Sequence, residues 1–138
     1  MQYLVDTNVF SEVTKEIPTP QVVDWLTRYG PLLVTSDIVL AEVQFGISRL
    51  QKGARRDRLE DWFHKLLRRL DQNIIPFDTR VALAWARYRV QWHQQGFQAP
   101  VQDGMIAATA RFHGLTVATR NVADFEKTGC EVVNPFEA

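Results

Sequence analysis

Three acidic residues in this sequence of 138 residues stand in apolar surroundings. Asp6 ends a short apolar run, Glu42 lies inside the apolar stretch Ile38–Val43, and Asp103 opens an apolar segment. A buried carboxylate without a partner costs several kcal/mol or takes up a proton. No Lys or Arg stands three or four residues from any of these acids, where it could pair along a helix. The three acids therefore predict a shared site.

The residue types in this set indicate a hard metal ion. Carboxylates a few ångströms apart repel by several kcal/mol at an effective dielectric constant of about 20, and a divalent cation removes that repulsion. Ligands that are all oxygen suit Mg²⁺ or Mn²⁺. The histidines and the single cysteine, by contrast, have no zinc-site spacing. The sequence also contains no glycine-rich phosphate loop and no nucleophile elbow. Carboxylates with a hard metal predict chemistry on phosphates.

Each acid also has an ordinary structural explanation. Asp6 can cap the next helix, with Thr7 or Asn8 sharing the task. Asp103 suits the first turn of a helix, where the helix dipole favours negative charge. Glu42 can pair with a cation on a neighbouring helix. These alternatives remain open from the sequence alone.

A polar segment from Thr119 to Asp124 follows a predicted strand and adds further candidates. It offers the Thr119 hydroxyl, the Arg120 guanidinium, the Asn121 amide and the Asp124 carboxylate. Arg120 is a candidate for a phosphate contact. Segments rich in Asn and Asp are also common as simple turns, so this one is informative only together with the three acids.

The elements that must position these residues alternate between strands and helices. Apolar runs predict strands at residues 2–5, 32–35, 73–77, 115–118 and 131–133. Helical spacing and capping residues predict helices at residues 20–29, 37–53, 55–71, 79–95 and 101–113. This order predicts a single α/β domain over residues 1–138, a three-layer fold with a central, mainly parallel sheet flanked by helices. Ligands of such folds bind at the carboxyl ends of the strands, where Asp6 and the 119–124 segment lie.

The composition of the chain indicates what class of protein it is and in which compartment it works. A content of 46% hydrophobic and 23% charged residues indicates a globular chain, and no apolar run approaches the ~20 residues that span a bilayer. No signal peptide is visible, and the lone Cys130 suits a reducing compartment, so we expect a cytoplasmic protein without membrane contact. The net charge is zero, and half of the basic residues lie between 49 and 69. We interpret most of these as a solvated helix face with pairs such as Asp61 with Lys65.

Four motifs in order resemble those of PIN domains, and more narrowly those of the VapC toxins of bacterial type II toxin–antitoxin pairs, including the FitB branch. The motifs are Leu4-Val5-Asp6-Thr7-Asn8, Ala41-Glu42-Val43-x-x-Gly46, Asp103-Gly104-x-Ile106-Ala107-Ala108-Thr109-Ala110, and Val117 to Asn121 followed by Val133-Asn134-Pro135-Phe136. The resemblance implies a PIN fold, a Mg²⁺ or Mn²⁺ site, endoribonuclease activity and a homodimer. It also implies inhibition by an antitoxin protein, through which operator DNA is contacted.

The resemblance assigns roles residue by residue. Asp6, Glu42 and Asp103 match the acidic metal ligands, and Thr7 and Thr119 match supporting hydroxyls. The chain departs from many relatives at Asn121, where they have an aspartate. An amide brings no charge, so we expect one tightly bound divalent ion rather than two.

Hard-metal chemistry then predicts the reaction. We expect Asp6 and Asp103 to hold the ion, with Glu42 and Asp124 around it, and metal-activated water to hydrolyse RNA phosphodiesters. Glu42 or Asp124 would accept the proton. The reaction does not use the 2′-hydroxyl, which predicts products with 5′-phosphate and 3′-hydroxyl ends.

Two other functions are compatible with parts of the pattern. An aspartyl-phosphate phosphatase would use Asp6 as its nucleophile, but such enzymes usually carry a second aspartate two residues on, where this chain has Asn8. A catalytically silent PIN-like binding module is the second alternative, and the intact Asp6, Glu42 and Asp103 argue against it.

The antitoxin prediction extends to particular surfaces. Two helices carry apolar stripes that we expect to form part of the groove for an antitoxin helix. The stripes consist of Val22, Val23 and Leu26 in one helix and of Leu59, Phe63 and Leu66 in the other. We also expect an antitoxin Arg or Lys to approach the acidic cluster, because a guanidinium pairs well with carboxylates.

Overall fold

The computed structural model describes all residues 1–138 and contains one five-stranded sheet. The strands follow the order β3-β2-β1-β4-β5, and all neighbours are parallel. They are β1 (Tyr3–Val5), β2 (Leu33–Ser36), β3 (Ile74–Ile75), β4 (Thr116–Ala118) and β5 (Glu131–Val133). All five predicted strands are present. β3 is only two residues long, since Pro76 has no N–H with which to continue the pairing.

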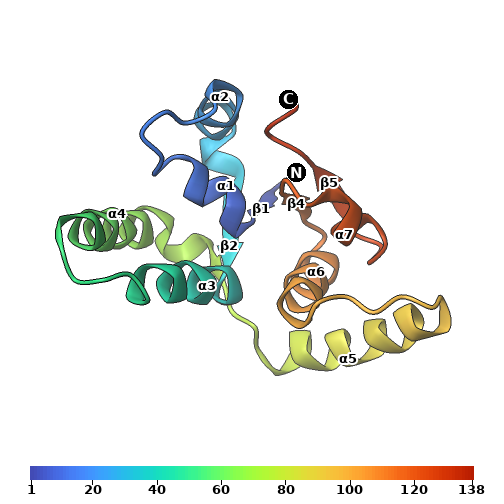
Figure 1. Cartoon of the computed structure of the whole chain (residues 1–138). Helices are drawn as coiled ribbons and strands as arrows, with labels where there is room; N and C mark the ends of the chain where they lie inside the picture. The colour runs from blue at the N-terminus through green and yellow to red at the C-terminus, as the bar shows by residue number, and fades with distance from the viewer.

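Seven helices surround this sheet and give the α/β architecture that the sequence predicts. They are α1 (Thr7–Glu12), α2 (Pro20–Arg28), α3 (Asp37–Ser48), α4 (Ala54–Leu70), α5 (Thr79–Gln94), α6 (Val101–His113) and α7 (Val122–Glu126), with short 3-10 turns η1 (Gly30–Leu32) and η2 (Asp71–Asn73). In Figure 1, α3 and α4 lie together on one flank, α5 and α6 lie together on the other, and α1 lies between them. None of these helices has the length and apolarity needed to cross a bilayer.

The helices differ from the prediction in two respects. α1 and α7 were not predicted, because six and five residues are too few for a helical period to appear in the sequence. The helix predicted over residues 37–53 is shorter in the structure, where α3 ends at Ser48. Gly53 instead directly precedes α4, and residues 49–53 turn the chain so that α3 and α4 pack against each other.

The core lies around β1, β4 and α6. Leu4, Val5 and Val117 are fully buried, as are Ile106 and the alanines of α6. At the start of α6, a Cβ atom on Gly104 would lie 3.3 Å from both Trp85 Nε1 and Trp92 Cζ3. Glycine therefore permits the close approach of α6 to α5. Asp103 lies in the first turn of α6, and the alanines that follow it are buried in the core.

The apolar stripes that were predicted to form one groove lie in three different places. Val22 and Phe63 are core residues, so they are not available to a partner. Leu59 lines a hollow between α1, α3 and α4. The remaining residues line a hollow of about 340 Å³ between α2 and α4, which we call the apolar groove. Its apolar lining includes Phe10, Val13, Val23, Leu26, Leu66 and Leu70.

Candidate active site

The pairing of β1 with β4 brings Asp6 and Thr119 together at the carboxyl edge of the sheet. Val5 and Ala118 are partners in register, so the residue that follows each strand lies beside the other. The Asp6 backbone N–H donates to Ala118 O at 3.0 Å, and the Thr119 hydroxyl donates to Asp6 Oδ2 at 2.8 Å. Only 3% of Asp6 is exposed. Parallel pairing thus builds the centre of the site from residues 113 positions apart.

Asp6 also caps the N-terminus of α1, the structural role that the sequence allows for it. Its Oδ1 accepts from the Thr7 backbone N–H at 2.8 Å. Its Oδ2 accepts from Thr119 and, at 3.4 Å, from Asn8 Nδ2. Burial raises the pKa of the Asp6 carboxyl, and the hydrogen bonds from Thr119 and Thr7 oppose that rise. The hydrogen bonds from Thr7 and Thr119 together fix one orientation of the Asp6 carboxyl group. Burial alone would disfavour the charged form of this group.

Glu42 reaches the same region from α3. Its Oε2 accepts from the Thr7 hydroxyl at 2.7 Å, which links α3 to the start of α1. Burial raises the pKa of Glu42, and the negative charge of Asp6 adds to that rise. The four ion pairs of the protein all lie elsewhere, so a cation partner for Glu42 is excluded. The space beside Gly46, one turn further along α3, is open, as the glycine at this position indicates.

Asp103 enters from the first turn of α6. Partial burial raises its pKa to about 6, and the negative charges of Asp6, Glu42 and Asp124 contribute in that order. The dipole at the start of α6 would lower this pKa. Because the net shift is upward, burial and repulsion outweigh the dipole. The four acids are therefore close enough to one another to share one electrostatic environment.

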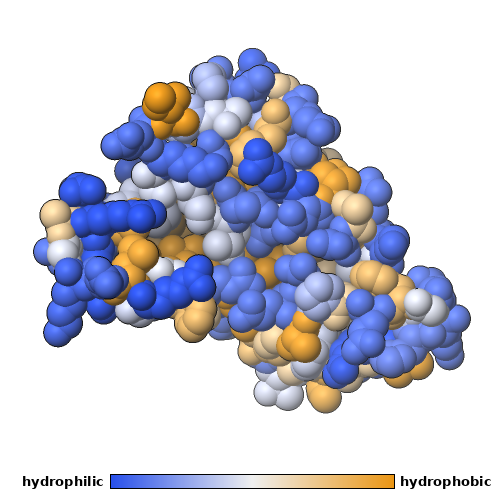
Figure 2. Space-filling model, in the orientation of Figure 1, coloured by the Kyte–Doolittle hydropathy of each residue, from blue (hydrophilic) through white to orange (hydrophobic).

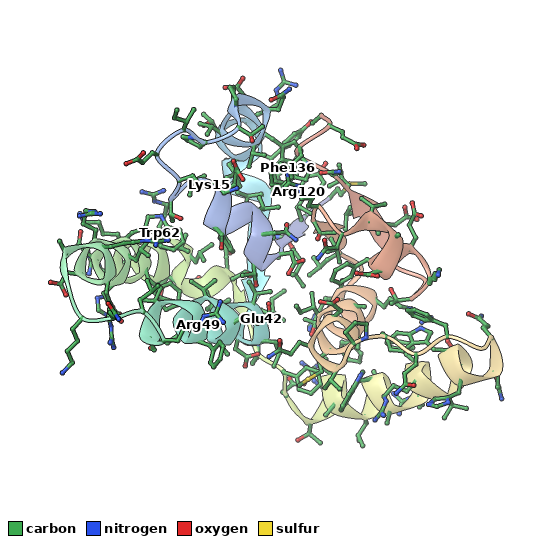
Figure 3. The ribbon with its side chains drawn as sticks, viewed as in Figure 1. Lys15, Glu42, Arg49, Trp62, Arg120 and Phe136 are labelled. Carbon is green, nitrogen blue, oxygen red and sulfur yellow. The ribbon has the colours of Figure 1, made fainter.

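The segment after β4 is only partly a loop, since α7 begins at Val122. Asp124 lies in the first turn of α7 with an exposed side chain, near enough to Asp103 for its charge to act there. The Asn121 backbone N–H donates to Thr119 Oγ1 at 3.0 Å, and the Asn121 side chain is exposed. The Arg120 guanidinium lies 4.2 Å from the centre of the Phe136 ring (Figure 3).

Sequence reasoning missed the role of Asn8. Its Nδ2 donates to Thr119 Oγ1 at 3.2 Å as well as to Asp6, and its Oδ1 accepts from the Arg120 backbone N–H at 3.1 Å. Asn8 therefore ties the segment after β1 to the segment after β4. The only signal in the sequence is an amide two residues after a strand-ending aspartate, and the partners of this amide after β4 lie more than 110 residues away.

The arrangement offers oxygen donors and no neutralising side chain. Four carboxylates come from the end of β1 and from α3, α6 and α7, and none of them forms an ion pair with Lys or Arg. Figure 3 shows Glu42 at the part of α3 that faces α6. No three acidic, histidine or cysteine side chains converge as a ready three-ligand set. A hard cation that retains several waters and takes one or two direct carboxylates, as Mg²⁺ does, fits this donor set.

Burial of Asp103, together with repulsion from the other acids, predicts a pH effect on stability in the metal-free protein. The pKa of Asp103 is about 6 in the folded chain, above its ordinary value of 3.8. Between these values the folded state binds more protons than the unfolded state, so the free energy of unfolding that Asp103 contributes falls as pH rises through this range. After allowance for partial exposure the loss is about 1 kcal/mol.

Urea unfolding in EDTA at pH 4.5 and pH 7.5 checks this prediction. Asp103→Asn should gain about 1 kcal/mol relative to wild type on going from the lower to the higher pH. Groups with lowered pKa values, such as Glu12, are the same in both proteins, and their opposite pH effect cancels in the comparison. An equal stability difference at the two pH values would contradict the prediction.

Comparison with known proteins identifies the family. The model of the PIN domain matches residues 3–129. The VapC ribonuclease Y4jK of Sinorhizobium fredii is 36% identical, with 97% of each chain covered. The toxin FitB of Neisseria gonorrhoeae is 35% identical over 96% of this chain and 97% of its own.

A solved structure agrees with these relatives. The structure of FitAB bound to the IR36 DNA fragment contains a chain with a TM-score of 0.92 to this fold and 34% sequence identity, covering 98% of this chain and 96% of that one. Sequence motifs, sheet order and whole-chain similarity therefore agree. The chain belongs to the PIN-domain family, in the branch that includes the VapC ribonucleases and the toxin FitB.

Proposed function

We propose that this protein is a divalent-metal-dependent endoribonuclease that acts as the toxin of a type II toxin–antitoxin pair. One observation carries the proposal: four carboxylates gather at the carboxyl edge of a parallel sheet, and no cationic side chain neutralises them. Similarity to a VapC ribonuclease and to the toxin FitB supports RNA as the substrate. An RNA substrate and a free Cys130 also favour the cytoplasm as its location.

The acids divide into two groups in this proposal. Asp6 and Asp103 hold Mg²⁺ or Mn²⁺, and Glu42 and Asp124 contribute through water. A bound ion of this type lowers the pKa of a water molecule and neutralises phosphate charge. Because Asn121 supplies no charge, the site takes one ion tightly.

The chain's own residues orient the acids and move the proton. Thr119 and Asn8 keep Asp6 in place, and Thr7 holds Glu42 through Oε2. Glu42 Oε1 has no protein hydrogen-bond partner, so it is available to accept a proton from the attacking water. A raised pKa suits this role, because a stronger base removes the proton more readily. Arg120, whose backbone N–H donates to Asn8 Oδ1, contacts a phosphate of the substrate.

Incubation of the purified chain with RNA tests this function. We expect cleavage with Mn²⁺ or Mg²⁺, no cleavage with EDTA, and recovery when metal is added back. The products should carry 5′-phosphate and 3′-hydroxyl ends, since the proposed nucleophile is a water molecule and not the 2′-hydroxyl. Calorimetric titration should give about one tight Mn²⁺ per chain. Cleavage that persists in EDTA, or 2′,3′-cyclic phosphate ends, would contradict the mechanism.

The apolar groove between α2 and α4 is the proposed site for an antitoxin helix. Val23, Leu26 and Leu66 line it and are at least partly exposed, as apolar anchors for a helix must be. The solved structure of FitAB is bound to a DNA fragment, which supports a complex of this chain with an antitoxin and DNA. We assign the contact with operator DNA to the antitoxin. An antitoxin Arg or Lys would then reach the carboxylate cluster.

A homodimer is proposed through α5 and α6. Leu83 and Val90 of α5 and Val101 of α6 are 56–64% exposed, and Phe112 of α6 is 36% exposed. Exposed apolar side chains grouped on two adjacent helices are typical of a subunit interface. Sedimentation of the free protein at twice the chain mass would support this interface, and a monomer at micromolar concentration would contradict it.

A further inference from the structure

The hollow between α1, α3 and α4 begins at the carboxylate site. It has a volume of about 670 Å³, and its lining includes Thr7 and Glu42, which are hydrogen-bonded to each other. Gln102, next to Asp103, also lines it. A ligand in this hollow therefore extends from the acids without crossing any other element. We call it the basic groove, for the Lys15, Arg49 and Arg55 side chains along it.

Cations on three different elements face the basic groove. Lys15 follows α1, Arg49 follows α3, and Arg55 lies in the first turn of α4. A smaller hollow lined by Lys15, Arg55 and Arg58 continues outward. Arg49, Arg55 and Arg58 form no ion pair, whereas Lys15 pairs with Glu12. In Figure 3, Lys15 and Arg49 lie on either side of the region between Glu42 and Trp62.

The solvated-face interpretation covered most of the basic residues between 49 and 69, and three of them are exceptions to it. Lys65 pairs with Asp61, and Arg56 pairs with Glu60, as expected along a helix. Arg49, Arg55 and Arg58 instead line hollows connected to the acidic site. In a chain of zero net charge, this local excess of cations is the feature that a polyanion would recognise.

Aromatic rings accompany the cations. Phe45 of α3 lines the basic groove with 67% of its surface exposed, and the Arg49 guanidinium lies 5.5 Å from the centre of its ring. Trp62 of α4 lines both the basic groove and the apolar groove, and forms the wall between them. Exposed rings among unpaired cations are the surface on which single-stranded bases stack while phosphates are held.

The two grooves differ in the partner that they suit. The lining of the apolar groove is mostly hydrophobic, eight of its twelve residues, which fits the apolar face of a helix. The basic groove carries three cations and three hydroxyl groups beside six hydrophobic side chains, one of them the largely exposed Phe45, and it opens at Glu42. Figure 2 shows strongly hydrophilic side chains bordering the region of α3 and α4 on this face.

We propose that the basic groove binds the single-stranded RNA segment on one side of the scissile phosphate, with Lys15, Arg49 and Arg55 contacting phosphates and a base stacked on Phe45. The proposal rests on the ribonuclease function proposed above. Phe45, Arg49 and Arg55 are positioning residues, because they fix where along the strand the carboxylates act.

RNA binding at equilibrium, measured in EDTA so that no cleavage occurs, tests the basic groove independently of catalysis. The probe is a fluorescein-labelled 12-nucleotide RNA of random sequence, and its fluorescence anisotropy is measured from 50 to 200 mM salt. The variants are Arg49→Ala, Arg55→Ala and Phe45→Ala. Their side chains are exposed, and circular dichroism verifies folding. Lys65→Ala is the matched control, since Lys65 is an exposed cation of α4 that pairs with Asp61 and lines neither groove.

Each variant has a distinct expected signature. Arg49→Ala and Arg55→Ala should raise the Kd about 5- to 10-fold at low salt and reduce the slope of log Kd against log salt by about 0.7. Phe45→Ala should raise the Kd about 5-fold or more with an unchanged slope, because stacking releases no counterions. If these residues only supported the fold, the arginine variants and Phe45→Ala would not differ in the salt dependence of their Kd. Lys65→Ala should bind as the wild type does.

Three outcomes would overturn the inference. If wild type cleaves RNA with Mn²⁺ but the three variants bind like Lys65→Ala, the groove assignment fails and the nuclease function stands. If the variants keep RNA affinity and instead lose retention of the co-expressed antitoxin, the groove binds protein. If wild type neither binds nor cleaves RNA, the proposed function fails together with the groove.

Discussion

Asp6→Asn is expected to slow RNA cleavage by about two orders of magnitude or more while the chain stays folded. Asp6 is the most buried of the four acids and takes hydrogen bonds from Thr119, Thr7 and Asn8, so its loss removes both charge and alignment at the centre of the site. Asparagine keeps an oxygen for the Thr7 backbone N–H and is as good a helix cap as aspartate.

Single-turnover cleavage with saturating Mn²⁺ measures this effect, with urea unfolding as the check on folding. Asp24→Asn is the matched control, because Asp24 is an exposed aspartate of α2 that belongs to neither groove. The control should cleave at the wild-type rate. A fully active Asp6→Asn protein would show that the proposed metal site is not where the chemistry occurs.

Leu66→Glu is expected to weaken inhibition by the antitoxin about 100-fold or more without lowering cleavage by the free protein. Leu66 lines the apolar groove, and a helix that docks there would bury the introduced carboxylate without a partner, at a cost of several kcal/mol. The groove shares only Trp62 with the lining of the basic groove, and none of the four acids lines it. Catalysis is therefore expected to be unaffected.

Growth of cells that express the variant together with its cognate antitoxin measures the loss of inhibition, and cleavage assays with added antitoxin give its size. Lys65→Glu places a carboxylate at the neighbouring position of α4, outside the groove, and should remain fully inhibited. Continued inhibition of folded Leu66→Glu would rule out this groove. An unfolded Leu66→Glu protein would assign Leu66 to the core instead.

The local pattern of the sequence was enough to predict the strands, the five longer helices and most residues of the candidate site. Apolar runs located all five strands, and Pro100 and Gly114 bounded α6 as observed, with Gly114 at a φ of 67°. Asp6 and Thr119 were predicted near each other because both follow parallel strands, whose carboxyl ends share one edge. These features depend on residues that are neighbours in the sequence, so they can be predicted from the sequence directly.

The partners of these side chains were decided only by tertiary structure. The hydrogen bonds of Asn8 with Thr119 and of Thr7 with Glu42 depend on strand order and on the packing of α3 against α1. Helical spacing placed Val22, Leu59, Phe63 and Leu66 on apolar faces. It could not assign two of them to the core, one to the basic groove and one to the apolar groove. The physical reason is that periodicity identifies the face of a helix, while burial and charge pairing depend on which other element covers that face.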